Sequence, residues 1–309
     1  MLFHRSVFAT VIALGLGCSS SRSNEPTTPA PPPAEVDANV SAMSNDPGME
    51  VDAGLAESPS MGPVAIERGE RREVPTPNPT VRITAPANNR TITDNRVEVR
   101  LAVQNWRDVN NADDHRHIHL VLDNEPYRRI DDPTRPVTLE NLTPGRHVLR
   151  AFPGWETHET VKTNGAYSMV VFNVGRPAPG AGGFNPRDPL LTYSRPKGEV
   201  NGADAERILL DWYLSGIPAD RFGAEGYRVR PRIDGNEMEP LTAWVPHYIV
   251  NLPDGEHTIG LTLLNPEGQP VPGPFNSVEQ RITVNRRAPP PAPAPASGDA
   301  GAPDPHAGH

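Results

Sequence analysis

The chain has 309 residues, a length that suggests about two domains. It contains 38 prolines and 26 glycines, about a fifth of all residues, which excludes a single compact helical domain. The formal net charge of −9 at pH 7 provides no overall positive field for phosphates, so nucleic acid is not an expected partner. No apolar run reaches the roughly 18 residues that a spanning helix needs, which excludes a polytopic membrane protein.

Residues 1–17 are typical of an export signal, in which Arg5 precedes an apolar stretch. Cys18 is the only cysteine of the chain, so no intramolecular disulfide can form. The run Gly-Leu-Gly-Cys ending at Cys18 and followed by serines resembles a bacterial lipobox. The resemblance implies a lipoprotein signal peptide, acylation of Cys18, and a lipid-anchored location in the cell envelope, on the periplasmic or surface face of the outer membrane. A plain secretory signal is the alternative.

The composition divides the rest of the chain. Residues 24 to 80 hold eleven prolines and ten acidic residues, with few side chains to bury, so 18–80 is expected to be a disordered, Pro-rich acidic linker. Residues 176–189 form a second linker rich in Pro and Gly. Residues 286–309 form a Pro/Ala-rich tail, also expected to be disordered.

The two remaining pieces, 81–175 and 190–285, are predicted to be rich in β-strands. In the first, apolar residues alternate with polar ones from Val97 to Val103, which is typical of a half-buried strand. The following apolar runs are short and are bounded by turn residues, as in an antiparallel sandwich of about seven strands.

The two pieces also match each other in sequence. Asp123-Asn124 is followed by the run Asn-Leu-Thr-Pro-Gly-Arg-His, which ends at His147. Asp234-Gly235 is followed at nearly the same interval by Asn-Leu-Pro-Asp-Gly-Glu-His, which ends at His257. The shared pattern of a strand end, a tight turn and a new strand indicates a tandem repeat.

This repeated motif resembles that of bacterial immunoglobulin-like domains. Phrases such as HIHLVLDNEPY and GEHTIGLTLLNPEGQPVPGPFN are similar to exported bacterial lipoproteins that carry tandem immunoglobulin-like domains. The fold class implied is all-β, with two tandem antiparallel immunoglobulin-like β-sandwiches between a stalk and a tail. The family resembled supplies no function to transfer.

The densest group of chemically active side chains lies between Asp113 and His119. A strand places His117 and His119 on one face, about 6.6 Å apart, where both imidazoles can bind one Zn or Cu ion. His115, His147 and His158 are candidates for the remaining ligands, with Glu156 and Glu159 nearby. The alternative is that these histidines lie on a solvated or partly covered sheet face and bond carboxylates such as Asp123.

His147 has its own structural interpretation. His257 occupies the matching position of the second repeat, where no His-x-His pair is present, so a turn role shared by both copies explains His147 without a metal.

Trp155, in the segment PGWETHE, is the aromatic residue most suggestive of an exposed ligand platform, because Pro and Gly precede it as they do in many binding loops. The alternative is that it packs in the sandwich core, as most aromatic residues of β proteins do.

No catalytic motif is present: the sequence lacks a G-x-S-x-G elbow, an H-E-x-x-H pair and a phosphate-binding glycine loop. The sequence therefore favours a non-catalytic, lipid-anchored binding or structural protein without a cofactor, which displays its two domains to an envelope protein or glycan. The alternative is an envelope metal-binding protein that uses the histidines of the first domain.

Overall fold

A computed structural model of the chain describes residues 62–163, 165–176 and 185–287. Cys18, the signal segment, most of the first predicted linker and the C-terminal tail lie outside the described residues. Both sandwiches belong to one compact unit. In the described part of the chain, no helix is long and apolar enough to cross a membrane.

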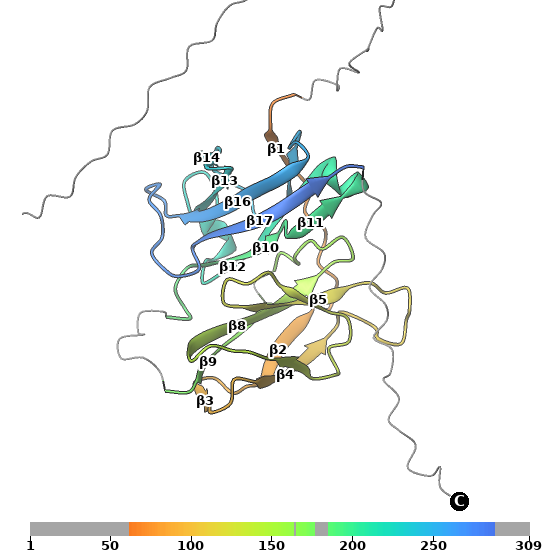
Figure 1. The fold of residues 1–309 in the computed structure, drawn as a ribbon, viewed down its shortest axis with the longest axis vertical. Helices are drawn as coiled ribbons and strands as arrows, with labels where there is room; N and C mark the ends of the chain where they lie inside the picture. Colours follow the sequence, from red (N-terminus) through yellow and green to blue (C-terminus); the bar gives the residue numbers. More distant parts are fainter. Residues whose placement is uncertain (1–61, 164, 177–184, 288–309) are drawn as a thin grey trace, which may run out of the picture. The chain divides into compact units, whose positions relative to one another are not determined.

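The first sandwich packs a three-stranded sheet against a five-stranded sheet (Figure 1). Its strands are β2 (Thr80–Ala85), β3 (Arg90–Ile92), β4 (Val97–Gln104), β5 (His117–Leu122), β6 (Arg128–Ile130), β7 (Val137–Leu139), β8 (Gly145–Gly154) and β9 (Ser168–Val174). The sheet orders are β2-β4-β7 and β3-β9-β8-β5-β6. The alternation that predicted β4 is observed, because Val97 and Val99 are buried while Glu98 and Arg100 are exposed.

The second sandwich repeats this arrangement. Its strands are β10 (Leu190–Arg195), β11 (Gly198–Asn201), β12 (Arg207–Ser215), β13 (Arg228–Ile233), β14 (Asn236–Glu237), β15 (His247–Val250), β16 (Gly255–Leu264) and β17 (Ser277–Asn285), with short 3-10 turns η1 (Gly202–Ala205) and η2 (Ala219–Arg221). The larger sheet has the order β11-β17-β16-β13-β14. The all-β fold with two immunoglobulin-like sandwiches is thereby confirmed. Each sandwich differs from a purely antiparallel one in a single short parallel pair, β3 with β9 and β11 with β17.

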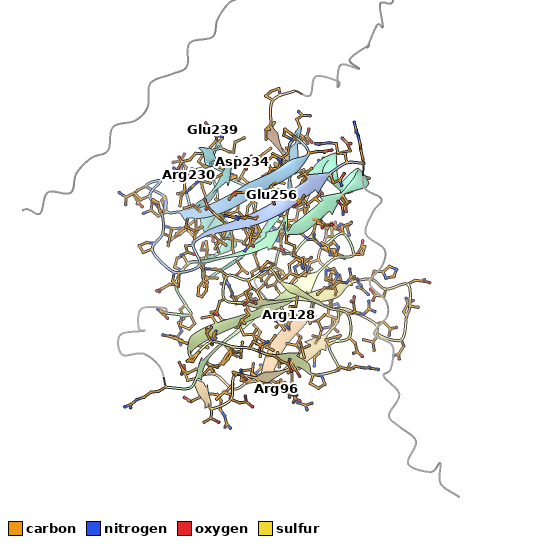
Figure 2. The ribbon with its side chains drawn as sticks, in the orientation of Figure 1. Arg96, Arg128, Arg230, Asp234, Glu239 and Glu256 are labelled. Carbon is orange, nitrogen blue, oxygen red and sulfur yellow. The ribbon has the colours of Figure 1, made fainter. Side chains whose placement is uncertain are left out.

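The repeated turn motif has the same hydrogen bonds in both copies. His147 Nδ1 lies 2.7 Å from an Asp123 carboxylate oxygen and His147 Nε2 lies 2.8 Å from the Thr143 carbonyl. His257 makes the matching contacts with Asp234 and the Pro253 carbonyl, at 2.7 and 2.9 Å; Figure 2 labels Asp234. The histidine therefore joins two turns in each sandwich.

Strand β1 (Ala65–Arg68) departs from the linker predicted for residues 18–80. It pairs antiparallel with β15, so the smaller sheet of the second sandwich has the order β1-β15-β12-β10. Ile66 packs against the core of that sandwich. The proline-rich composition hid this strand, because only four residues are needed to extend an existing sheet edge.

The hydrophobic core of the second sandwich extends into its contact with the first, which keeps a separate core of its own. Val121, Tyr127 and Phe152 of the first sandwich belong to the same buried cluster as the inner residues of the second. Phe152 stacks on Tyr213 of β12, with ring centroids 5.0 Å apart. Consequently β5 and β8 are buried on both faces along most of their length.

A buried ion pair crosses this interface. Lys162 Nζ donates to an Asp211 carboxylate oxygen, to Thr160 Oγ1 at 2.6 Å and to the Trp212 carbonyl at 3.0 Å. The Thr160 amide donates to the other Asp211 oxygen at 2.6 Å. The side chains of Lys162 and Asp211 are only 3% and 0% exposed, so their charges depend on these partners.

We expect Lys162→Met to lower the free energy of unfolding by about 3–5 kcal/mol, because it leaves the Asp211 carboxylate buried without its cation. The double variant Lys162→Met/Asp211→Leu should recover a large part of this loss, since it removes both charges. Urea unfolding followed by tryptophan fluorescence measures both values. A Lys162→Met protein as stable as the wild type would contradict a structural role for the pair.

Candidate metal centre

The centre starts from the alternation of side chains along β5. Ile118 and Leu120 point into the core of the first sandwich, so His117 and His119 share the opposite face. That face is the one covered by the second sandwich. Both imidazoles are completely buried.

A tight turn after β8 adds His158 to this pair. The Trp155 amide donates to the Glu159 carbonyl and the His158 amide donates to the Trp155 carbonyl, both at 2.9 Å. His158 has a φ of 68°, in the left-handed region, and this conformation reverses the chain. A bridge between Gly154 and Thr160 closes the turn, which brings the His158 ring over β5.

The three imidazoles converge through one nitrogen each. His117 Nε2 lies 3.0 Å from His119 Nε2 and 3.2 Å from His158 Nδ1. All three nitrogens lie within 4.8 Å of one another. Zn–N bonds of about 2.0–2.1 Å in a tetrahedron separate ligand nitrogens by roughly 3.3 Å. The two pairs that include His117 Nε2 are close to this separation, and a shift of the His158 ring, which borders the cleft, would bring the third pair to it.

The outer nitrogens hold two of the rings in place. His117 Nδ1 lies 3.1 Å from the His115 carbonyl, which can only accept, so Nδ1 carries the proton and Nε2 presents its lone pair to the centre. His119 Nδ1 lies 3.1 Å from Ser194 Oγ of the second sandwich. A hydroxyl both donates and accepts, so Ser194 suits either tautomer of His119. Such outer partners are typical of metal-binding histidines.

Burial keeps the three rings neutral. It lowers the pKa of His117 to about 4 and that of His158 to about 2, and it places the pKa of His119 well below its ordinary value. The positive charge of Arg195 acts in the same direction on all three pKa values. Neutral imidazole is the form that binds a metal ion.

His119 has little room to move. The Tyr127 ring stacks on it with centroids 3.7 Å apart and planes at 8°. On the other side lies Gly154, where an added Cβ would overlap the imidazole at Nε2. The ring is therefore held between an aromatic face and bare backbone.

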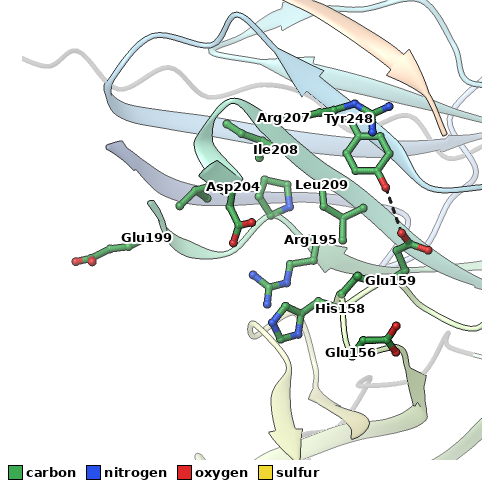
Figure 3. A pocket seen from close by; sticks show the side chains of 13 residues that line it. Glu156, His158, Glu159, Arg195, Glu199, Asp204, Arg207, Ile208, Leu209 and Tyr248 are labelled. Carbon is green, nitrogen blue, oxygen red and sulfur yellow. Dashed lines mark hydrogen bonds between the residues drawn. The ribbon is translucent and has the colours of Figure 1, made fainter. Parts of the chain in front are cut away.

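A cleft between the two sandwiches, about 370 Å³ in volume, is lined by His158 (Figure 3). His158 lines it from the first sandwich and Arg195 from the second, and Figure 3 shows the two side chains beside each other. Arg195 Nε donates to the Tyr127 hydroxyl at 3.0 Å, and Lys197 Nζ donates to the Tyr127 carbonyl at 2.7 Å.

The other two histidines of the predicted set lie elsewhere. His115 is exposed, and only its carbonyl takes part, through His117 and Arg129. His147 has both ring nitrogens occupied by Asp123 and the Thr143 carbonyl. The structure thus brings together His117, His119 and His158 and leaves out His115 and His147.

Trp155 is half-buried, in contrast to the exposed position expected of a ligand platform. Its ring meets the Trp106 ring edge to face at a centroid distance of 4.8 Å, and the Arg72 guanidinium lies 5.2 Å from its centroid. The Arg72 guanidinium also bonds Glu156 at 2.7 Å. Both contacts pack the Trp155 ring against other side chains of the protein.

Sequence reasoning did not find the residues that complete the centre. Tyr127, Ser194, Arg195 and Lys197 come from segments with no recognised motif. The one available signal is that the run from Leu190 to Ser194 contains no charged residue, which suits the strand covered on both faces that the structure shows.

No family model and no curated protein matches the chain. Among solved structures, the fibronectin(III)-like modules of Clostridium thermocellum CbhA match 69% of this chain and 98% of theirs, at 12% identity and a TM-score of 0.26. The central fibronectin-III array of RIM-binding protein matches 69% of this chain and 70% of its own, at 9% identity and a TM-score of 0.22. Bacteroides ovatus SGBP-B, solved with a mixed-linkage heptasaccharide, matches 66% of this chain and 47% of its own, at 11% identity and a TM-score of 0.20. These likenesses concern the fold alone.

We expect Gly154→Ala to destabilise the protein by about 1–3 kcal/mol, because the new methyl group must displace the His119 ring from a packed interior. Gly223→Ala is the matched control, since a Cβ there meets nothing within 4 Å. Denaturant midpoints of the two variants measure the difference. Equal midpoints would show that the His119 ring is not confined.

Proposed function

We propose that this chain is an exported envelope protein whose first immunoglobulin-like domain binds one transition-metal ion through His117, His119 and His158. The observation that carries the proposal is the convergence of three neutral imidazole nitrogens within 4.8 Å. Three histidines are a ligand set that zinc uses when a fourth position stays open. Imidazole ligands suit both Zn and Cu, and both ions remain candidates.

The setting of the histidines supports a binding role. Two of the rings are buried in the contact between the sandwiches, and the third lines a cleft that a small ion can enter. The ring orientations exist before any ion arrives, because Ser194, Tyr127 and the His115 carbonyl hold them. Pre-organisation of this kind reduces the ordering cost of binding.

The immunoglobulin-like sandwich is a frequent structural or binding module, which suits a protein that binds and does not catalyse. We further propose that Cys18 is acylated and that the lipid holds the protein at the cell envelope. The support is the lipobox-like run at Cys18 and the acidic, proline-rich composition that follows it. An envelope protein or glycan is the proposed further partner.

Calorimetric titration of the untagged chain with Zn²⁺ and Cu²⁺ tests the metal site. We expect one ion per chain, bound more tightly than about 10 μM. His117→Ala/His119→Ala and His158→Ala should each abolish stoichiometric binding. His115→Ala should retain it, because the exposed His115 ring lies outside the cluster. Loss of binding in His115→Ala, or unchanged binding in the double variant, would contradict the assignment.

Lipid anchoring has a separate test. Cells that express the wild-type chain should incorporate labelled palmitate into it, and the protein should sediment with the membrane fraction. Cys18→Ala should lose both properties, because acyl chains supply the membrane affinity. Equal membrane retention of the two proteins would rule out an anchor at Cys18.

A further inference from the structure

The three histidines alone would leave the charge of a bound metal ion uncompensated. All three candidate ligands are neutral imidazoles, so a divalent ion bound by them keeps its full charge. Zinc and copper sites of this kind have at least one more coordination position to fill. The described residues offer no carboxylate in the cluster to fill it.

Two cationic side chains of the second sandwich, Arg195 and Lys197, lie beside the cluster. Arg195 Cζ and Lys197 Nζ lie 5.4 and 4.0 Å from the centroid of the Tyr127 ring, which stacks on His119. Arg129 lies nearby as well, but Asp131 pairs with it at 2.8 Å. Lys162 is neutralised by Asp211. Among the described residues, Arg195 and Lys197 contact Tyr127 and have no carboxylate within ion-pairing distance.

Arg195 is placed to bind a ligand. Its Nε is used by the Tyr127 hydroxyl, which fixes the guanidinium, while its side chain lines the cleft beside His158 (Figure 3). In the described part of the chain, no carboxylate lies within ion-pairing distance of it. Four acidic residues line the same cleft. Glu156 and Glu159 pair with Arg72, whereas Glu199 and Asp204 come from the second sandwich and form no ion pair with Arg195 among the described residues.

We propose that the metal ion takes an oxyanion, a carboxylate or phosphate group, as a further ligand, and that the Arg195 guanidinium binds the same anion from the second sandwich. This inference rests on the proposed metal site. A guanidinium presents two parallel N–H groups that match two oxygens of such a group. One oxygen would reach the metal while the Arg195 fork holds the anion, so the ligand would connect the two sandwiches through the cleft.

The proposal makes metal and anion binding reciprocal. An anion that offsets the charge of Arg195 and Lys197 should raise the metal affinity, and the metal should raise the anion affinity by the same factor. We expect the Kd for Co²⁺, a spectroscopic substitute for Zn²⁺, to fall about tenfold when the anion is present. The visible absorption of bound Co²⁺ should change as the new ligand enters its coordination sphere.

The experiment is a Co²⁺ titration of the full chain in acetate, in methyl phosphate and in perchlorate, all at one ionic strength. Acetate and methyl phosphate distinguish a carboxylate from a phosphate ligand, and perchlorate controls for screening. Both test anions bind free Co²⁺ weakly, which opposes the expected tightening. Arg195→Gln should reduce the anion-dependent factor to about one, and Arg195→Lys should keep only part of it, because lysine lacks the fork. Arg82→Gln, an exposed arginine on β2, should behave as the wild type.

The outcomes separate the two proposals. If the wild-type chain binds no Co²⁺ under any condition, both the metal site and the anion ligand are wrong. If Co²⁺ binds with the same Kd and spectrum in all three salts, the metal site stands and the anion proposal is overturned. An anion effect that survives unchanged in Arg195→Gln also overturns it, since Arg195 is then not the anion's partner.

Discussion

The whole molecule depends on the second sandwich covering the outer face of β5 and β8. An immunoglobulin-like sheet normally buries one face and leaves the other to water. Here both faces are dry, so each polar side chain on the covered face needs a partner of its own. Arg150 shows how this is met: it is 1% exposed, donates to Thr192 Oγ1 at 3.0 Å, and lies 4.4 Å from the Phe275 ring centroid. The same exclusion of water lowers the pKa of His117 and of His119, which keeps both imidazoles neutral.

The covered face also explains why the N-terminal segment is structured. Residues 62–80 pass along both sandwiches before the first begins. Strand β1 extends the smaller sheet of the second sandwich, and Arg72 then pairs with Glu156 and Glu159 on the turn that carries His158. Arg71 donates to the Lys162 carbonyl just beyond that turn. The segment therefore supports the third histidine from outside, while Thr160 and Lys162 attach the same turn to Asp211 from inside.

Much of this could be predicted from local patterns. The His-x-His alternation predicts that His117 and His119 share one face and that Ile118 lies in the core. The match between the two repeats predicts the structural role of His147. His158 was in the candidate set, but its approach to β5 depends on a left-handed residue that no short-range rule assigns to histidine. The contact between the two sandwiches cannot be predicted from the sequence, because two adjacent β-domains can be joined with or without an interface. Ser194 and Arg195 enter the centre only through that contact, so no motif marked them.

Comparison of the two repeats identifies why the histidine cluster occurs in only one of them. The six residues before Asp123 are HIHLVL, and the six before Asp234 are RVRPRI. The outward positions are thus His117, His119 and Val121 in one copy, and Arg228, Arg230 and Arg232 in the other. The arginines remain half-exposed, and two of them pair with Glu237 and Glu279 at 3.1 Å; Figure 2 labels Arg230 on this face. Three charged side chains suit a sheet face open to water, whereas two imidazoles and a valine suit a face that is covered. The three-histidine cluster is therefore a property of the covered face rather than of the domain fold, since the second sandwich has the same His–Asp turn but arginines in place of the histidines.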